Sequence, residues 1–278
     1  MGIVIGIDIG GSTTKIVGIR GDEPVTPMLV KAADPIASLF GAFGKFVDHN
    51  SLSLDDISQI MITGVGASFI DRAIYGLPTG KVEEFLSNGY GGLYLSGLPR
   101  AVICSMGTGT ALVSASGDRI EHMGGTGIGG GTIIGLAMRM LNVRNTDVVS
   151  RLAEDGDLSN IDLMVGDITQ DSLPGLPPHT TASNFGKIKE MATPNDIAVG
   201  ILNLVFQSIG VTASFAVRSA GMNDVVLIGN LTSIPLCKYI FSELRSLFNI
   251  NFIIPDHSEY GTALGAALAE RKERFLKL

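Results

Sequence analysis

The apolar positions of the N-terminal part of the chain follow strand spacing, then helix spacing, then strand spacing again. β-Branched residues alternate with glycine over Ile3–Asp8, and apolar runs at Lys15–Arg20 and Val25–Val30 predict two more strands. An aspartate before Pro35 is typical of a helix N-cap with proline at the first helical position, and apolar residues then recur at helical spacing. Together with a strand expected over Gln59–Thr63, this order predicts a mixed sheet covered by helices.

A similar order of elements begins again in the second part of the chain. Ala101–Met106 is an apolar strand that ends in a glycine loop, and Ala111–Ala115 predicts the strand after it. Just before this strand, Gly97-Leu98-Pro99 ends the helix that is predicted to run through Tyr94, and we place the boundary between segments 1–98 and 99–278 there. The repeated strand, loop and strand predict two related halves that face each other across a cleft. Helices are expected over residues 133–141, 146–153, 194–220 and 235–248, and strands over 225–230 and 252–254.

Composition and charge restrict the class of protein. Hydrophobic residues make up 45% of the 278 residues and charged residues 17%, which is typical of a globular chain with a substantial core. With 20 basic residues against 27 acidic ones, the net charge of −7 argues against binding to nucleic acid. We find no apolar run as long as a membrane span and expect no signal peptide. Cys104 and Cys237 fit no CxxC pattern, which indicates the reducing cytoplasm. Together, these features predict a cytoplasmic protein without membrane or nucleic-acid partners.

The first candidate site follows the N-terminal strand. Asp8 ends that strand, and the segment Gly10–Lys15 contains two glycines, three hydroxyl side chains and a lysine. Adjacent glycines let the backbone turn sharply and bring N–H groups close to an anion, while Lys15 adds a positive charge. A carboxylate at a strand end suits Mg²⁺ held through water, because this ion prefers one or two carboxylates together with phosphate oxygens. The segment predicts a site for nucleotide phosphate with Mg²⁺, and a plain Gly-Gly hairpin turn is the alternative.

Two further glycine-rich segments are candidates for anion binding. Gly107–Thr110 follows the first strand of the second half, in the place where Gly10–Lys15 follows the first strand of the chain. Gly124–Thr132 has six glycines in its first eight residues and leads into an apolar helix. A glycine loop at a helix N-terminus directs free N–H groups and the positive end of the helix dipole towards an anion. Its spacing fits neither the Rossmann nor the Walker pattern, and a hinge or a tight packing site is the alternative.

Six motifs occur in one order along the chain, namely DIGGSTTK, SMGTGT, GGTGIGGGT, IDLMVGDI, ASNFGK and VLIGN. In this order they resemble the type II pantothenate kinases, the bacterial relatives of the eukaryotic enzymes, over nearly the whole chain. The resemblance implies an α/β fold of the actin/hexokinase/Hsp70-like kind, with two RNase-H-like halves around a nucleotide cleft. It also implies a homodimer, with the long helices as the expected contact.

The resemblance implies transfer of the γ-phosphoryl group of ATP to the primary hydroxyl of pantothenate, the first step towards coenzyme A. Asp8 resembles the residue that helps to hold Mg²⁺, Thr108 resembles a phosphate contact, and Asn230 lies where the family contacts the nucleoside side of ATP. The residues expected at the nucleotide are Asp8, Gly10, Gly11, Ser12, Thr13, Lys15, Gly107, Thr108, Gly109, Gly130, Gly131, Thr132 and Asn230.

The catalytic base of the family is a glutamate in a V-x-E segment just before a helix, which falls here on Glu84. A carboxylate within hydrogen-bond reach can accept the proton of the attacking hydroxyl. Without the resemblance, a glutamate beside another glutamate would be assigned to a solvated helix start. The match of Val82 and of the downstream Gly91–Tyr94 segment favours Glu84 over Glu83.

One position departs from the family. Type II pantothenate kinases carry an arginine two residues before the first glycine of the GGTGIGGGT segment, and this chain has His122 there. His122, Gly124 and Gly125 are therefore the candidate acceptor-binding residues, with Arg119 or Arg139 as other cations that could reach the acceptor. Arginine offers a planar fork of five donors and a permanent charge, which the shorter histidine does not. We expect that pantothenate is still the acceptor, but that the protein binds its carboxylate or the developing charge more weakly than an arginine would. A different small hydroxylated acceptor is the alternative.

Three other protein classes share parts of this pattern. GIDIGGSTTK also resembles the ATPase activators of radical acyl-CoA dehydratases, which hold an iron–sulfur cluster between subunits. We expect no such cluster, because Cys104 falls in an apolar strand and Cys237 in a helix. A sugar kinase of the ROK type lacks support because its zinc-binding Cys/His cluster is missing. A non-catalytic ATP-binding scaffold is the third alternative.

Overall fold

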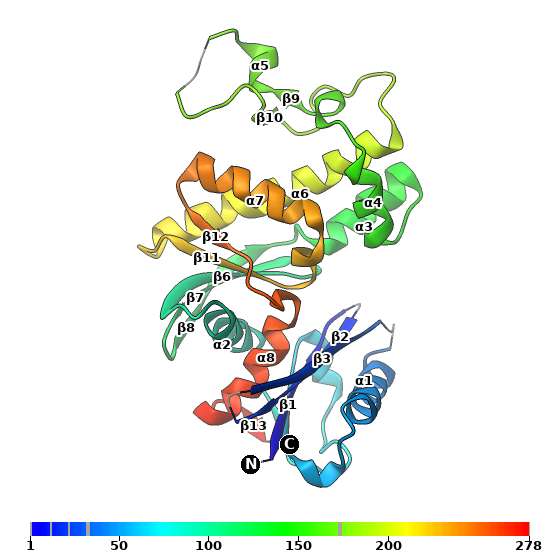
Figure 1. Ribbon diagram of the computed structural model, residues 1–278, viewed down its shortest axis with the longest axis vertical. Helices are drawn as coiled ribbons and strands as arrows, with labels where there is room; N and C mark the ends of the chain where they lie inside the picture. Colours follow the sequence, from blue (N-terminus) through cyan, green and yellow to red (C-terminus); the bar gives the residue numbers. More distant parts are fainter. Residues whose placement is uncertain (1, 12, 22, 32–33, 172–173, 278) are drawn as a thin grey trace.

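Two β-sheets form the centre of the molecule in the computed structural model, which describes residues 2–11, 13–21, 23–31, 34–171 and 174–277 (Figure 1). Within these residues the first sheet has the strand order β13 (Leu276–Lys277), β5 (Thr79–Lys81), β4 (Ile57–Thr63), β1 (Ile3–Ile9), β2 (Thr13–Arg20) and β3 (Glu23–Lys31). The second has the order β12 (Asn251–Ile253), β11 (Asp224–Ile228), β6 (Arg100–Met106), β7 (Thr110–Ser116) and β8 (Arg119–Thr126).

The two sheets repeat one topology. In the first, β1, β2 and β3 form an antiparallel meander, β4 lies parallel to β1, and β5 lies parallel to β4. In the second, β6, β7 and β8 form the meander, β11 lies parallel to β6, and β12 lies parallel to β11. The predicted mixed α/β class with two related halves is thereby confirmed. Strands β5, β8 and β13 were not expected, and β8 takes up the start of the glycine-dense segment that was predicted to be a loop.

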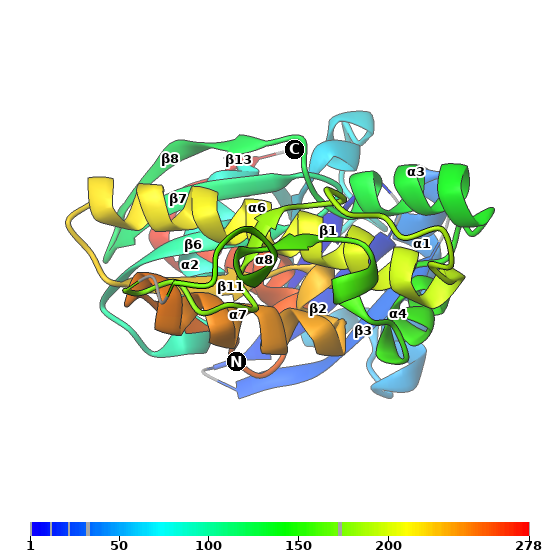
Figure 2. The ribbon, with the colours of Figure 1, turned by 90° about the horizontal axis from the view of Figure 1, so that it is seen from above.

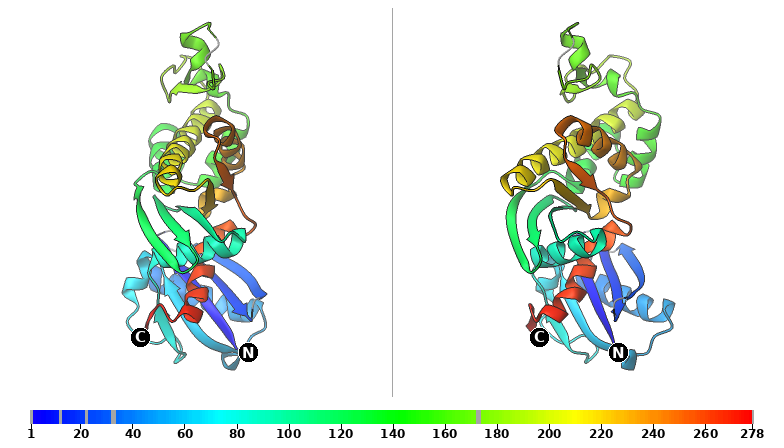
Figure 3. Two further views of the ribbon diagram at one scale, coloured as in Figure 1. Left: turned by 90° about the vertical axis from the view of Figure 1, so that its left-hand side faces the viewer. Right: turned by 60° about the vertical axis from the view of Figure 1, so that its left-hand side comes forward.

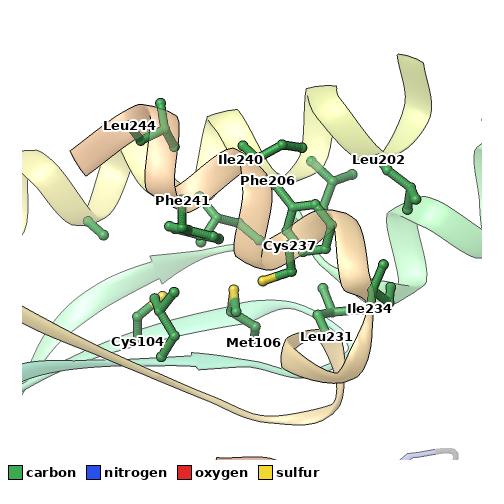
Figure 4. Close-up of a cluster of buried hydrophobic side chains, with 14 of the residues drawn as sticks. Cys104, Met106, Leu202, Phe206, Leu231, Ile234, Cys237, Ile240, Phe241 and Leu244 are labelled. Carbon is green, nitrogen blue, oxygen red and sulfur yellow. The ribbon is translucent and has the colours of Figure 1, made fainter. Parts of the chain in front are cut away.

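Helices cover the outer faces of both sheets. Helix α1 (Pro35–His49) begins as expected, with Asp34 Oδ1 accepting from the backbone N–H of Ala37 at 2.6 Å, and it packs against the first sheet. The second sheet packs against α3 (Gly130–Leu141), α4 (Thr146–Glu154), α6 (Pro194–Ser219) and α7 (Pro235–Phe248). Figure 2 shows α6 and α7 lying across the second sheet, and Figure 4 shows the core beneath them, where Cys104, Met106, Phe206, Cys237 and Phe241 meet.

Helices α2 (Glu84–Ser96) and α8 (Gly261–Ala269) lie between the two sheets (Figure 3). Helix α2 belongs to the segment 1–98 yet packs on the second sheet, while α8 belongs to the segment 99–278 and packs on the first sheet. The two helices also touch each other closely, since a Cβ at Gly91 would lie 1.8 Å from the carbonyl oxygen of Gly261. The segments 1–98 and 99–278, our proposed halves, therefore exchange a helix across their contact.

A small projecting segment, residues 161–171 and 174–187, stands at the top of Figure 1, away from both sheets. It contains β9 (Leu163–Met164), α5 (Val165–Ile168) and β10 (Thr181–Ser183). Asp162 is fully buried at its base, and its carboxylate accepts from Thr181 Oγ1, Asn184 Nδ2, the Phe185 N–H and Asn203 Nδ2 at 2.8–3.1 Å. These bonds fix the segment to α6. A cavity of about 600 Å³ lies between the segment and helices α6 and α7, and none of the predicted site residues lines it.

Helix α6 is, among the described residues, the one helix long and apolar enough to cross a membrane by length and composition. Of its most apolar window, 67% is buried inside the protein, against the second sheet and helices α3, α4 and α7. This burial is typical of the core helix of a globular protein.

Candidate active site

The predicted site residues lie where strands of both sheets end. Asp8 of β1 pairs with Thr63 of β4, so the carboxyl ends of two parallel strands meet at one edge of the first sheet. The ends of β6 and β11 meet in the same way in the second sheet. Ligands of α/β sheets bind in the crevice outside such carboxyl ends. The fold thus directs the loops after β1 and β6 towards a common place.

Two contacts show that these loops approach each other. Asn230, just after β11, donates from Nδ2 to Thr13 Oγ1 at 3.0 Å, which joins residues 217 positions apart. A Cβ placed on Gly11 would lie 3.7 Å from Thr108 Oγ1. The first glycine turn, the second glycine loop and Asn230 therefore lie together where the two halves meet, at the place expected for the nucleotide cleft. Ser12, also predicted at the phosphates, lies outside the described residues.

Asp8 and Lys15 form a buried ion pair on this edge. Lys15 Nζ donates to Asp8 Oδ2 at 3.4 Å, and the side chains are only 7% and 11% exposed, respectively. Gly64, directly after β4, closes the other side of the carboxylate, since a Cβ there would lie 2.6 Å from Asp8 Oδ1. With φ of +86°, Gly64 also has a backbone conformation that side chains rarely adopt. The sequence marked Gly64 only as the end of a strand, not as a residue of the site.

The hydroxyl residues of the first turn point to different sides. Thr13 and Lys15 lie on one face of β2, as alternate residues of a strand do, and Thr13 faces the cleft through its bond with Asn230. Thr14 is buried on the opposite face, where its Oγ1 accepts from Ser38 Oγ of α1 at 2.6 Å. Of the hydroxyls expected near phosphate, Thr14 therefore belongs to the core.

Glu84 is the first residue of α2 and is half-buried, whereas Glu83 is the exposed N-cap residue. Burial raises the pKa of Glu84 above its ordinary value, and the negative charge of Asp8 raises it further, while Lys15 lowers it. Because the charges of Asp8 and Lys15 both act on its carboxyl group, Glu84 lies near the Asp8–Lys15 pair. A half-buried carboxylate with a raised pKa is a suitable general base.

The second glycine loop and the start of α3 form one unit. The N–H groups of Gly130 and Gly131 donate to the carbonyl oxygens of Gly107 and Thr108, both at 2.9 Å. Thr132 Oγ1 accepts from the N–H of Gly129 at 3.1 Å. The N–H groups of Gly130 and Gly131 are therefore not free, which corrects the expectation of open donors at this helix start. Close packing of two backbones explains the glycines here, because a Cβ on Gly129 would lie 2.6 Å from the carbonyl oxygen of Thr108.

The candidate acceptor residues lie on strand β8 and not in a loop. Gly124 and Gly125 pair with Leu112 and Ala111 of β7, which corrects the expected loop boundary. His122 is exposed on the same strand, and its ring stacks on Phe85, the residue after Glu84. Phe85 was not predicted as a site residue, although its position beside Glu84 was a signal that could have identified it.

The two cysteines lie away from the cleft. Both are fully buried in the core of the second half (Figure 4), and burial raises the pKa of the Cys104 thiol to about 12. The pKa of Cys237 is raised as well, by burial and by the nearby Cys104. In the part of the chain that the structure describes, no three or more His, Cys, Asp and Glu side chains cluster in a way that could hold a metal ion.

Comparison with protein families and curated proteins gives consistent matches. The family model described as Fumble matches residues 98–269. The protein named type II pantothenate kinase of Staphylococcus haemolyticus (strain JCSC1435) is 28% identical over 276 residues, covering 94% of this chain and 98% of that protein. The protein of the same name from Bacillus cereus (strain G9842) is 26% identical over 272 residues, covering 92% and 89% of the two chains.

Solved structures with similar folds include two ATP-analogue complexes. The activator of the 2-hydroxyisocaproyl-CoA dehydratase from Clostridium difficile, with bound ADPNP, gives a TM-score of 0.69 at 17% identity over 98% of this chain and 95% of that chain. A ROK family glucokinase from Streptomyces griseus, in complex with glucose and AMPPNP, gives a TM-score of 0.63 at 11% identity over 98% and 100%. This likeness confirms the expected fold with two halves around a cleft.

Proposed function

The chain belongs to the Fumble family, and from this premise we propose that it is a type II pantothenate kinase. It transfers the γ-phosphoryl group of ATP to the primary hydroxyl of pantothenate and releases 4′-phosphopantothenate, the first step of coenzyme A biosynthesis. The observation that carries the proposal is the convergence of Glu84, Asp8 and Lys15 at the strand ends that border the glycine loops. Phosphoryl transfer depends mainly on positioning and on neutralising charge, and these groups can do both.

The phosphates of ATP are held by the two glycine segments. Gly10, Gly11, Thr13 and Lys15 lie on the side of the first half, and Gly107, Thr108 and Gly109 lie on the side of the second half, with the start of α3 packed behind them. Lys15 supplies a local positive charge for the phosphates. With a net charge of −7, the protein as a whole does not attract anions, so phosphate must be bound by such local groups. We assign Asn230 to the nucleoside side of ATP, and its bond to Thr13, which links the two halves, supports a place at the nucleotide.

Asp8 would hold Mg²⁺, through water. Its donor set fits this ion, because a nearly buried carboxylate at a strand end stands beside the phosphate-binding turn, and Mg²⁺ prefers one or two carboxylates with phosphate oxygens. Bound there, the ion would neutralise charge on the phosphate oxygens. Lys15 Nζ donates to the Asp8 carboxylate at 3.4 Å and so orients it before nucleotide arrives.

Glu84 acts as the base. Its carboxylate accepts the proton of the pantothenate hydroxyl as that oxygen attacks the γ-phosphorus, and the O–P bond to ADP breaks. Its raised pKa increases its basicity relative to an ordinary glutamate. Glu83, exposed at the N-cap position, has no role in this mechanism.

A phosphorylation screen tests the function directly. Purified protein is incubated with Mg-ATP and pantothenate, with simple sugars, or with no acceptor, and products are identified by mass spectrometry. We expect 4′-phosphopantothenate from wild type and from Glu83→Gln, and none above background from Glu84→Gln. ATP hydrolysis without transfer to any acceptor would favour an ATPase activator instead, and ATP binding with neither hydrolysis nor transfer would favour a non-catalytic scaffold.

A kinase of the same fold with another small hydroxylated acceptor is the second candidate. His122 favours it, because the family arginine at this place is replaced by a shorter side chain with fewer donors. If pantothenate is the acceptor, His122→Arg should raise or preserve kcat/KM for pantothenate, and His122→Ala should lower it. A sugar or a different hydroxy acid as the best acceptor in the screen would replace pantothenate in the proposal.

The dehydratase-activator alternative has less support. An intersubunit iron–sulfur cluster needs cysteines at a surface, and Cys104 and Cys237 are both fully buried in the core.

We further propose that the protein works in the cytoplasm as a homodimer that contacts its copy through the long helices, without nucleic-acid or membrane partners. The exposed Phe215 on α6 and Tyr239 on α7 support the choice of these helices, because large apolar side chains at a surface favour protein contacts.

A further inference from the structure

The rings of Phe85 and His122 stack face to face, and Phe85 is the residue directly after the proposed catalytic base in α2. Their centroids are 3.8 Å apart and their planes differ by 11°. Phe85 comes from the first turn of α2 and directly follows Glu84, whereas His122 comes from the middle of β8. The pair therefore joins the element that carries the base to the strand that carries the candidate acceptor residues.

The pair lies at the surface and not in a core. His122 is exposed, and Phe85 retains 37% of its accessible surface, which is high for a phenylalanine. Neither residue belongs to a hydrophobic cluster of the described chain. A stacked aromatic pair left open at a surface beside a catalytic group is better explained by a ligand contact than by stability.

A bulge in β8 sets the position of His122. Val113 of β7 pairs with His122, and Leu112 pairs with Gly124, so Met123 has no partner on β7. A β-bulge bends its strand and re-aims the neighbouring side chains, and such bulges are common next to active sites. Gly124 has φ of +138°, a conformation that residues with a side chain rarely adopt, so the backbone of the bulge requires a glycine at this position.

The stack covers one face of the imidazole and leaves its edge available. Throughout the described residues, no hydrogen bond or ion pair is formed by either ring nitrogen of His122. The stack on Phe85 fixes the plane of the imidazole ring. Its two ring nitrogens, of which one donates and the other accepts in the neutral form, therefore lie in one plane, where an arginine would present a planar fork of donors.

We propose that Phe85 is a positioning residue, which holds His122 beside Glu84 so that the imidazole edge contacts a carboxylate or carbonyl oxygen of the acceptor. The inference rests on the proposed function for the identity of the acceptor. Phe85 acts through His122 and touches no reacting atom. The pair restricts the acceptor to small molecules that carry, besides the hydroxyl, an oxygen acceptor within reach of His122.

A double-mutant cycle in acceptor kinetics tests this pairing. Phe85→Leu should raise KM for pantothenate about three- to tenfold, as expected for loss of an aromatic pair, while KM for ATP stays unchanged. His122→Ala should raise it as well, but adding it to Phe85→Leu should bring little further change. Phe85→Tyr keeps the ring and should behave as wild type. Met191→Leu, at an apolar side chain with 85% exposure to which no role is assigned, is the control and should leave both KM values unchanged.

Nuclear magnetic resonance separates the two proposals. The chain has four histidines, and His122→Ala assigns the His122 ring signals. These signals should show a ring-current shift that Phe85→Leu removes, and they should move when pantothenate is added with a non-hydrolysable ATP analogue. If wild type phosphorylates pantothenate while the signals stay still and the two substitutions act additively, the inference is overturned and the function stands. If wild type does not phosphorylate pantothenate, the function fails, and the same titration with the acceptor found in the screen decides the inference.

Discussion

Asp8 and Lys15 are directly paired across the antiparallel strands β1 and β2, and their charged atoms meet at 3.4 Å in a nearly buried site. The pair couples the fold to the chemistry, because the same two charges would serve Mg²⁺ and phosphate. An ion pair without solvent screening is costly to break on one side only, since the remaining charge stays buried without compensation.

Substitution of one partner should therefore reduce both stability and activity. Asp8→Asn should lower the free energy of unfolding by about 3 kcal/mol, and Lys15→Met should lower it similarly. The double variant should lose less than the sum, because no unpaired charge remains. Urea unfolding measures the stability, and titration calorimetry measures the affinity for Mg-ATP. Unchanged Mg-ATP affinity with full turnover in both single variants would contradict the phosphate-site assignment.

Removal of the Glu84 carboxylate should abolish turnover without affecting nucleotide binding. Glu84→Gln should lower kcat about 10²- to 10⁴-fold, the usual contribution of a general base, and leave ATP affinity nearly intact. Glu83→Gln is the matched control, one residue away and exposed. Wild-type turnover in Glu84→Gln combined with loss in Glu83→Gln would show that the base had been assigned one residue too late.

The raised pKa of Glu84 also gives a pH dependence of known sign. A base must be deprotonated, so kcat/KM should fall with decreasing pH at a higher pH than for an ordinary glutamate. The folded state holds the proton more tightly than the unfolded chain, so this stabilising contribution is full below the unfolded pKa and is lost as pH rises through the folded pKa. At pH 7, Glu84→Gln should therefore be more stable than wild type in thermal unfolding. A lower melting temperature would contradict the burial argument.

The bond between Asn230 and Thr13 should contribute to nucleotide binding by holding the two halves together. Asn230→Ala and Thr13→Val each remove one side of the 3.0 Å bond and should raise KM for ATP about three- to tenfold. Steady-state kinetics of the double variant should show non-additive effects, as expected for partners in direct contact. Fully additive effects would mean that the two side chains act on ATP independently.

The contact of α2 with α8 should tolerate no side chain at its closest points. Gly91→Ala would place Cβ 1.8 Å from the carbonyl oxygen of Gly261, so the helices must separate, and we expect a loss of about 3 kcal/mol or more. Gly44 in α1 is the matched control, because it is exposed with open space around its Cα. Gly44→Ala should stabilise by about 0.5–1 kcal/mol through helix propensity. Chemical unfolding of both variants tests the contrast.

The two cysteines should be unreactive in the folded protein. The thiolate is the reactive form, and burial both raises the pKa of Cys104 to about 12 and excludes reagents from either sulfur. A thiol reagent should modify Cys104 and Cys237 only at the rate of unfolding, and the purified protein should be colourless and free of iron. Rapid labelling of both residues under native conditions, or bound iron, would restore the activator alternative.

The sequence by itself determined the features that depend on neighbouring residues. The cap at Asp34 with Pro35, the bounds of α7 at Pro235–Phe248 and the strand end at Met106 follow from local patterns, and the structure confirms them. Strand β1 was also predicted, and it extends one residue beyond the expected end at Asp8, to Ile9. The recurrence of strand, glycine loop and strand was sufficient to predict two related halves. Local patterns succeed here because caps, glycine turns and the periodicity of apolar positions act over a few residues.

The tertiary structure decided the contacts between residues that are distant along the chain. Strands β5 and β13 have three and two residues, too few for a periodic pattern. Strand β5 forms by pairing with β4, and β13 forms because residues 276–277 return to the first sheet and pair with β5. The sequence could place Gly130 at a helix start but not foresee that its N–H would bond to Gly107. It could not show that Gly64 closes the site around Asp8, or that Phe85 stacks on His122. Such contacts depend on how the two halves pack, since burial and backbone approach between distant segments leave no periodic mark in the sequence.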